Sequence, residues 1–105
     1  MLDKTSLKLN DPDLLRHANY IDGQWVAADD GAVIEVRNPA NGALVATVPA
    51  MGAVETRRAI DAAAAAFPTW RAMVAKDRGV ILRRMYELMH ANVDDLAAIM
   101  TAEQG

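Results

Sequence analysis

The hydrophobic and polar positions follow two different periods, and the change between them divides the chain. In residues 20–50, short runs of β-branched and aromatic residues alternate with turn-forming residues. Three pairs separate these runs: Asp22-Gly23, Asp30-Gly31 and Asn41-Gly42. Each pair suits a tight turn, because aspartate, asparagine and glycine tolerate positive φ. The pattern therefore predicts three or four short strands in a β-meander over residues 20–48.

Beyond Pro49 the apolar positions recur about every 3.6 residues, which is typical of a helix that packs on one side. Residues 53–67 are rich in alanine, and Ile60 and Phe67 share one face with several of these alanines. A face of small residues allows close helix packing. The sequence predicts an amphipathic helix over residues 53–67 that ends at Pro68, because proline lacks the N–H that a helix interior needs.

Two more helices are predicted after this one. The first covers residues 75–91 and carries an apolar stripe along one face. The stripe is formed by Ile81, Leu82, Met85, Leu88 and Met89. The last helix covers residues 94–104, and Asn92 or Asp94 is expected to cap its N-terminus.

The helix predicted over residues 75–91 has two local defects. Val74 occupies the N-cap position, where a Ser or Thr side chain would stabilise the helix by roughly 1 kcal/mol. Gly79 lies inside the first turns and costs about the same relative to alanine. A helix with these defects depends on tertiary packing for its stability.

The N-terminal arm is predicted to cover residues 1–18. Within it, Asp11 and Pro12 predict a short helix. Asp11 serves as its N-cap, and Pro12 takes the first helical position, where the missing N–H costs nothing. The remaining residues, 19–105, form the second unit of the chain.

Composition limits the classes of partner. The chain has 105 residues, enough for one small domain with a modest core. Its 11 basic and 14 acidic residues give a net charge of -3, without the clustered positive charge that nucleic acid or an anionic membrane attracts. No stretch approaches ~18 uninterrupted apolar residues, and the N-terminus lacks the apolar core of a signal peptide. We therefore expect a cytoplasmic protein that binds neither nucleic acid nor membranes.

Catalytic chemistry is almost absent from the sequence. There is no cysteine, which excludes disulfides, a thiolate nucleophile and thiolate metal ligands. His17 and His90 lie far apart and lack a second ligand at helical spacing, so they are interpreted as surface histidines. Asp94 and Asp95 resemble half of a paired-carboxylate site, but acids in a first helical turn stabilise the helix dipole without any further role. We assign no catalytic, cofactor-binding or metal-binding residue.

The remaining candidates for binding also have ordinary interpretations. Two arginine pairs resemble phosphate clamps in composition only: Arg57-Arg58 and Arg83-Arg84. Acids are interspersed with them, which is typical of solvated helix faces. Three methionines fall at helical spacing: Met85, Met89 and Met100. They are interpreted as core-filling residues rather than as a binding surface.

Six segments, in this order, resemble the start of an aldehyde dehydrogenase. They are YIDGQWV (20–26), NPANG (38–42), LVATV (44–48), AIDAAAAAFPTW (59–70), RGVILRRMYELM (78–89) and DDLAAIMTAEQG (94–105). The asparagine-proline turn, the alanine helix ending in Phe-x-x-Trp, the Arg-x-x-x-Leu helix and the closing Glu-Gln-Gly carry the resemblance. Within the family the chain is most similar to the NAD(P)-dependent succinate-semialdehyde dehydrogenases.

The resemblance implies an α/β fold, of which this chain is the N-terminal part: a short β-meander followed by three helices, without the core of the nucleotide-binding sheet. Residues 19–105 would be a partial N-terminal segment of the NAD(P)-binding domain. In relatives, several hundred further residues hold the catalytic cysteine, the general-base glutamate and the oxyanion asparagine. Some relatives also bind a monovalent cation through backbone carbonyls, here around Val36 and Arg37, but we assign no cation because such ligation leaves no side-chain signature.

Two hypotheses follow for function. In the first, the chain is the N-terminal fragment of an oxidoreductase that converts succinate semialdehyde or a related aldehyde to the carboxylate with NAD or NADP through a cysteine thioester. The parent would be a homo-oligomer. The chain alone would be inactive, would bind no nicotinamide, and would pair with the remainder of the fold or with a second copy through its apolar helix face. In the alternative, it is a stand-alone interaction module without catalytic activity.

Overall fold

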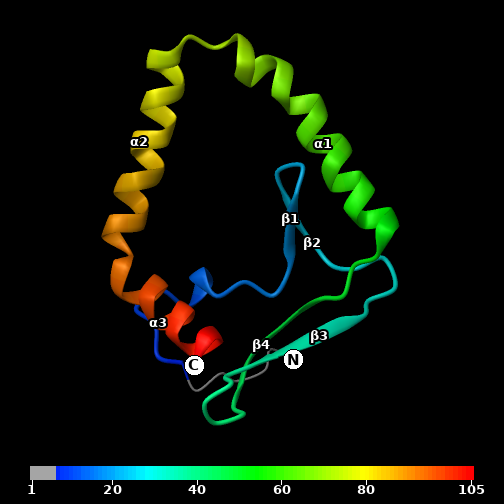
Figure 1. Cartoon of the computed structure of the whole chain (residues 1–105), viewed down its shortest axis with the longest axis vertical. Coiled ribbons are helices and arrows are strands. Elements are labelled where there is room, and N and C mark those ends of the chain that lie inside the picture. The colour runs from blue at the N-terminus through cyan, green and yellow to red at the C-terminus, as the bar shows by residue number, and fades with distance from the viewer. Residues whose placement is uncertain (1–6) are drawn as a thin grey trace.

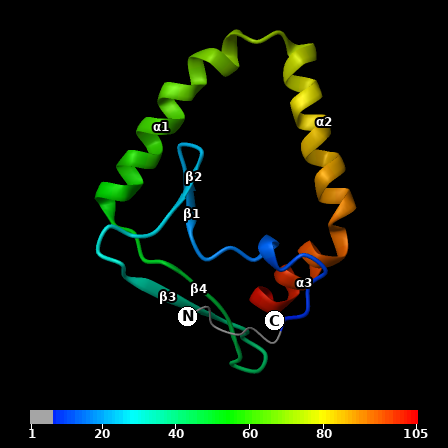
Figure 2. The ribbon, with the colours of Figure 1, turned by 180° about the vertical axis from the view of Figure 1, so that it is seen from behind.

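Helices α1 (Ala53–Ala72) and α2 (Ala75–Ala91) form two sides of an open frame (Figure 1). The structure is a computed structural model that describes residues 7–105, so residues 1–6 of the predicted arm lie outside the described residues. The radius of gyration is 16.5 Å, whereas a compact domain of this length would have about 13 Å. The reverse view in Figure 2 shows the same arrangement, with the β1–β2 hairpin between the two helices. The predicted order, short strands followed by three helices, is confirmed.

The arm contains the short helix predicted at Asp11 and Pro12. It is a single 3-10 turn, η1 (Pro12–Leu14). The Asp13 backbone N–H donates to the Asp11 carboxylate at 3.0 Å, so Asp11 is the N-cap, and Pro12 takes the first helical position. The local sequence therefore determines this turn through its cap.

The strands form two separate hairpins instead of one continuous meander. Their bounds are β1 (Asn19–Ile21), β2 (Gln24–Val26), β3 (Val33–Arg37) and β4 (Leu44–Pro49). β1 pairs with β2 and β3 pairs with β4, both antiparallel, in two sheets. Gly31 has the positive φ expected of its turn, 74°. That turn, however, redirects the chain from the first sheet to the second and does not return it beside β2.

In the first hairpin, Asp22 and Gly23 form the turn that the sequence predicts. Their φ values are 51° and 76°, as the two central residues of a tight hairpin turn require. Across the ladder, Tyr20 pairs with Trp25, and their ring centroids lie 5.0 Å apart in an edge-to-face arrangement. Cross-strand aromatic pairs stabilise such short hairpins.

In the second hairpin, the asparagine-proline sequence opens the connection between β3 and β4. The Asn38 N–H donates to the Ala43 carbonyl at 2.8 Å, and the Gly42 N–H donates to the Asn38 carbonyl at 2.7 Å. Gly42 has a φ of 73°, so the predicted reversal is confirmed. The register shifts between Val36 and Arg37, which leaves Val45 as an extra residue of β4 opposite the end of β3.

Helix α1 corrects one prediction, because it continues through Pro68 to Ala72. The proline removes one backbone hydrogen bond, since it has no N–H to donate to the carbonyl of Ala64. Five consecutive alanines, residues 62–66, precede it. Alanine has the highest helix propensity, and extending a formed helix is much easier than starting one. The alanine run therefore carries the helix across a residue that was expected to end it.

Helix α3 (Val93–Gln104) follows α2 with only Asn92 between them. Asn92 occupies the N-cap position of α3, but its side chain makes no cap there. It donates from Nδ2 to the Leu88 carbonyl at 2.8 Å, so it satisfies the C-terminal end of α2. The prediction that the side chain of Asn92 or Asp94 caps the third helix is therefore wrong.

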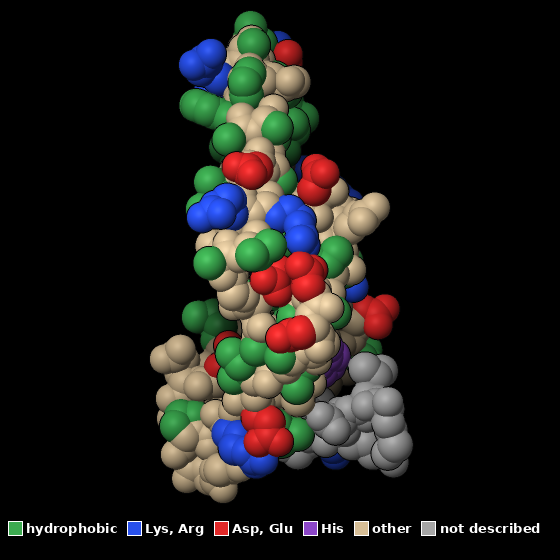
Figure 3. Space-filling model, turned by 90° about the vertical axis from the view of Figure 1, so that its right-hand side faces the viewer, with side chains coloured by type: hydrophobic (Ala, Val, Ile, Leu, Met, Phe, Trp, Pro, Cys, Tyr) green, Lys and Arg blue, Asp and Glu red, His purple; other side chains and the backbone are tan. Residues whose placement is uncertain are grey.

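The apolar core is small and lies at the base of the frame in Figure 1. Among the described residues, four hydrophobic side chains are buried: Ala28, Val45, Ala46 and Ala102. Three partly buried residues pack against the cluster of Val45, Ala46 and Ala102: Leu7, Leu15 and Val36. The arm, the second hairpin and α3 therefore meet at this core. On the α1 side of the molecule, hydrophobic side chains lie exposed among charged ones (Figure 3).

Candidate functional site

The two histidines have separate surroundings. Nδ1 of His17 lies 3.2 Å from the carbonyl oxygen of Thr47 in β4. His90 lies in the last turn of α2, where its ring stacks on Tyr86 with the centroids 5.9 Å apart. Within residues 7–105, no group of three or more histidine, cysteine, aspartate or glutamate residues is placed to hold a metal ion. The region of Val36 and Arg37 is the end of β3, where the register with β4 shifts.

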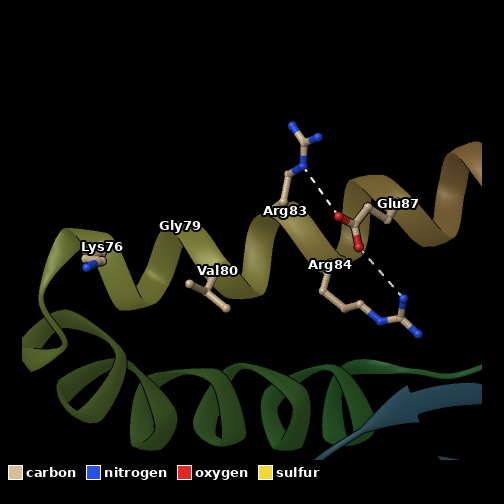
Figure 4. Close-up of a pocket in the computed structure, with 6 residues that line it drawn as sticks. All are labelled: Lys76, Gly79, Val80, Arg83, Arg84 and Glu87. Carbon is tan, nitrogen blue, oxygen red and sulfur yellow. Dashed lines mark ion pairs between the residues drawn. The ribbon is translucent and has the colours of Figure 1, made fainter.

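The pair Arg83-Arg84 lies on an exposed face of α2 with Glu87 (Figure 4). Glu87 pairs with Arg83 at 3.5 Å and with Arg84 at 3.8 Å. These residues line a shallow hollow together with Lys76, Gly79 and Val80, all from the same helix. One carboxylate offsets part of the positive charge, and both arginines remain well exposed. This is the solvated face that the sequence predicts.

Arg58 has a specific partner that the sequence pattern did not indicate. Its guanidinium donates two hydrogen bonds to the Asp29 carboxylate, at 3.1 and 2.9 Å. The hydrogen bond from Arg58 is the main cause of a lowered pKa of the Asp29 carboxyl, and the same bond raises the pKa of Arg58. The pair joins the loop after β2 to the second turn of α1. Its neighbour Arg57 is exposed.

Beside this pair, Glu55 is buried, with 7% of its surface exposed. One carboxylate oxygen accepts from the N–H of Gly52, and the other accepts from the N–H of Asp29, each at 3.3 Å. Glu55 is the third residue of α1, so the first bond is the glutamate half of a capping box. The sequence does contain a signal for this bond, because Gly52 precedes Glu55 by three residues at a predicted helix start. The bond to Asp29 had no such local signal.

Asp95 connects the third helix to the arm. Only 5% of its surface is exposed. Its two carboxylate oxygens accept from the backbone N–H groups of Asn10, at 2.9 Å, and Asp11, at 2.8 Å. Asp94 and Asp95 both lie in the first turn of α3, as predicted. Asp95 has this additional role because its partners are 84 and 85 residues away in sequence, beyond any local pattern.

The apolar stripe of α2 is exposed to solvent in the part of the chain that the structure describes. Ile81, Leu82, Met85, Leu88 and Met89 each keep between 46% and 56% of their surface exposed. Met100 on α3 is 67% exposed. The interpretation of Met85, Met89 and Met100 as core-filling residues is therefore wrong within this chain, because nothing in residues 7–105 buries them.

Among the described residues, no helix combines the length and hydropathy needed to cross a bilayer.

Several characterised proteins are similar to this chain in sequence. The model of the aldehyde dehydrogenase family matches residues 25–105. Glutarate-semialdehyde dehydrogenase of Pseudomonas putida is 54% identical over 99 residues, which are 94% of this chain and 21% of that protein. Succinate-semialdehyde dehydrogenase [NADP(+)] of Escherichia coli is also 54% identical over 99 residues, 94% of this chain and 20% of that protein. The match is to the N-terminal part of these relatives.

Solved structures share the arrangement as well as the sequence. Succinate-semialdehyde dehydrogenase from Burkholderia pseudomallei is 57% identical, with a TM-score of 0.88 over 92% of this chain and 20% of its own. An NADP-dependent enzyme of E. coli is 54% identical, with a TM-score of 0.90 over 93% of this chain and 20% of its own. The chain thus spans about a fifth of the length of its relatives. With the family match over residues 25–105, it belongs to the aldehyde dehydrogenase family and forms the N-terminal part of that fold.

Proposed function

We propose that this chain is the N-terminal segment of a nicotinamide-dependent semialdehyde dehydrogenase and supplies framework rather than reacting groups. One observation supports this proposal above the others. Over 94% of its length the chain is 54% identical to the N-terminal fifth of two semialdehyde dehydrogenases. The names of these relatives specify succinate and glutarate semialdehydes, and a 50% identical relative is named 3-sulfolactaldehyde dehydrogenase. All three substrates are aldehydes that carry an acidic group. The proposed substrate of the whole enzyme is therefore succinate semialdehyde or a similar acidic aldehyde.

The whole enzyme is proposed to use NAD or NADP, while the chain alone binds neither. NADP appears in the names of the E. coli and Saccharomyces cerevisiae relatives. The 105 residues contain no cysteine for the thioester and no glycine-rich phosphate loop. We place the whole enzyme in the cytoplasm as a homo-oligomer.

An activity assay tests this assignment. The purified chain is mixed with succinate semialdehyde and either NAD+ or NADP+, and NAD(P)H is followed by absorbance, with the E. coli relative as the positive control. We expect no rate above buffer. Turnover by the chain alone on the order of 1 per second would refute the proposal.

The alternative function, a stand-alone interaction module, is favoured by the uncovered apolar stripe of α2. The nucleotide sequence downstream of the segment that encodes these residues separates the two functions. Coding sequence for the cysteine region of an aldehyde dehydrogenase supports the N-terminal segment. Its absence, together with a stable monomeric chain, supports the module.

A further inference from the structure

The connection between β3 and β4 contains two asparagines with the same side-chain hydrogen bond. Oδ1 of Asn38 accepts from the N–H of Ala40 at 2.8 Å. Oδ1 of Asn41 accepts from the N–H of Ala43 at 2.9 Å. Each side chain therefore folds back along the backbone toward the next residue, as in an Asx turn. The connection lies at the lower edge of the frame in Figure 1, and Asn41 and Gly42 are exposed, so water reaches the second of these turns.

The residue after each asparagine decides what its side chain can do. The backbone nitrogen of that residue can attack the side-chain Cγ and close a succinimide ring, provided that the nitrogen carries a proton to lose. Pro39 follows Asn38 and has no N–H, so this ring cannot form there. Gly42 follows Asn41 and has an N–H and no Cβ to obstruct the approach. The other three asparagines of the chain precede larger residues: Asp11, Tyr20 and Val93.

We propose that Asn41-Gly42 is a site of spontaneous deamidation, and that Arg37 limits the rate by holding the turn closed. The Gly42 nitrogen loses its proton to hydroxide and attacks Cγ of Asn41. The new N–Cγ bond forms as the Cγ–Nδ2 bond breaks, and the leaving group takes up a proton from water to become ammonia. Water then opens the succinimide at either carbonyl carbon, which gives aspartate or isoaspartate. The net reaction consumes one water molecule and releases one ammonia.

Two hydrogen bonds of the turn act on this reaction in opposite directions. The Ala43 N–H donates to Oδ1 of Asn41, where negative charge develops when Cγ is attacked, so it stabilises that charge as an oxyanion-hole donor does. The Gly42 N–H donates to the Asn38 carbonyl at 2.7 Å, and this bond must open before the nitrogen can attack. The rate in the folded chain therefore depends on how often the turn opens.

Arg37 restrains the same turn through Gly42. Its Nη1 donates to the Gly42 carbonyl at 3.0 Å. Its Nε and Nη2 both donate to Oε2 of Glu35, at 3.1 and 2.7 Å. Glu35 thus fixes the guanidinium where it can hold the Gly42 carbonyl, and loss of the Arg37 side chain should let the turn open more often.

The modification would alter a crowded part of the fold. A Cβ on Gly105 would lie only 2.7 Å from Cγ of Pro39, so the connection has little free space on that side. Isoaspartate at position 41 continues the chain through its side-chain carbonyl and adds one backbone carbon to this connection. Deamidation also adds a negative charge to the net charge of -3. Because β4 follows and carries Val45 and Ala46 of the core cluster, a change at this exposed turn reaches the core.

The site is tested by incubating the whole 105-residue chain at mildly alkaline pH, where more of the Gly42 nitrogen is deprotonated. Mass spectrometry follows the peptides that contain the asparagines, with fragmentation that separates aspartate from isoaspartate. We expect both products at Asn41 before any product at the other four asparagines. Asn38 is the internal control, because it makes the same side-chain bond but precedes proline. Gly42→Ala should remove most of the product at Asn41.

The role of Arg37 is tested with Arg37→Met, which keeps an apolar stem but loses the bond to Gly42. Loss of one such bond should raise the rate in the folded chain about two- to tenfold. Exchange of the Gly42 amide should rise by the same factor, since both reactions need an open turn. Arg84→Met is the matched control, because Arg84 is also exposed and pairs with a glutamate of its own element, Glu87; it should leave both rates unchanged. In urea that unfolds the chain, wild type and both Met variants should react at one common, faster rate.

Three outcomes would overturn the proposal: modification of another asparagine ahead of Asn41, a rate in the folded chain equal to that in urea, or equal rates for the two Met variants in the folded chain. An unprotected Gly42 amide would show that the free chain does not form the turn. The same comparison is then made with the 105 residues in place of the matched segment of the E. coli relative, and the same three outcomes apply. The proposal does not rest on the proposed function, and none of these measurements depends on enzyme activity.

Discussion

Replacing Asp95 with asparagine should release the N-terminal arm. The Asp95 carboxylate is the acceptor for the N–H groups of Asn10 and Asp11, at 2.9 and 2.8 Å. Asparagine has the same shape, but one of its two terminal atoms is an NH2 group that cannot accept. In Asp95→Asn, one backbone N–H therefore loses its acceptor, and the other keeps a neutral acceptor in place of a charged one.

The expected cost follows from these two changes. A hydrogen bond to a charged acceptor contributes roughly 1.5–3 kcal/mol net, and one to a neutral acceptor about 1 kcal/mol. Losing one bond and weakening the other at a site only 5% exposed should cost at least about 2 kcal/mol, or roughly 30-fold or more in the equilibrium for releasing the arm. Because Leu7 and Leu15 pack against the core cluster, release of the arm also uncovers that cluster.

Amide hydrogen exchange at residues 10 and 11 measures this equilibrium directly, since exchange reports local opening. The control is Asp94→Asn, at an exposed neighbour in the same helical turn. Both variants lose a similar interaction with the helix dipole, roughly 0.3–1 kcal/mol. Only Asp95→Asn should speed exchange of the two arm amides by an order of magnitude or more. Equal exchange rates in both variants would show that Asp95 does not hold the arm.

Three further predictions concern the helices and the free chain. Gly79→Ala should stabilise α2 by roughly 0.5–1 kcal/mol, because an added Cβ meets nothing within 4 Å. The midpoint of urea unfolding should rise, and an unchanged midpoint would contradict this prediction. Arg58→Met should return the pKa of Asp29 upward toward its ordinary value of 3.8, measured by NMR titration. Since the folded pKa is lowered, the contribution of the pair to stability is present above that value and is lost as pH falls through the folded pKa; an unshifted titration would refute the pairing. The free chain should self-associate or unfold without a steep transition, because its stripe is exposed; a monodisperse monomer with one steep urea transition and no binding of a hydrophobic dye would argue against this.

The features that the sequence predicted correctly have local causes. The turn at Asp22 and Gly23 has positive φ at both residues, and the cap at Asp11 forms with a residue two positions away. Each depends on the intrinsic preferences of adjacent residues, which a single sequence displays. The prediction at Pro68 failed for a related reason. Two local preferences compete there, and the strong helix propensity of the preceding alanines outweighs one missing hydrogen bond.

The features that the sequence did not predict join distant residues. Asp95 and its partners are separated by 84 and 85 positions, and Glu55 reaches Asp29 across 26. Neither carboxylate stands out in its own helix, because acids are ordinary in a first turn. The pairing of strands into two sheets has the same origin. The turn at Gly31 fixes a local φ, but the direction in which the chain leaves it depends on packing elsewhere.

The contacts within the chain explain its open shape. α1 packs against β1, and α3 packs against α2 and β3. Carboxylates fix both lower ends of the frame: Glu55 holds the start of α1 to the loop after β2, and Asp95 holds α3 to the arm. Such bonds are directional, so they define where each helix begins, but they bury little apolar surface. Most large side chains along α1 and α2 remain exposed, including those of the apolar stripe. Polar anchors thus hold the segment together at its base, while its apolar helix faces stay exposed in larger measure than a domain that folds alone usually shows.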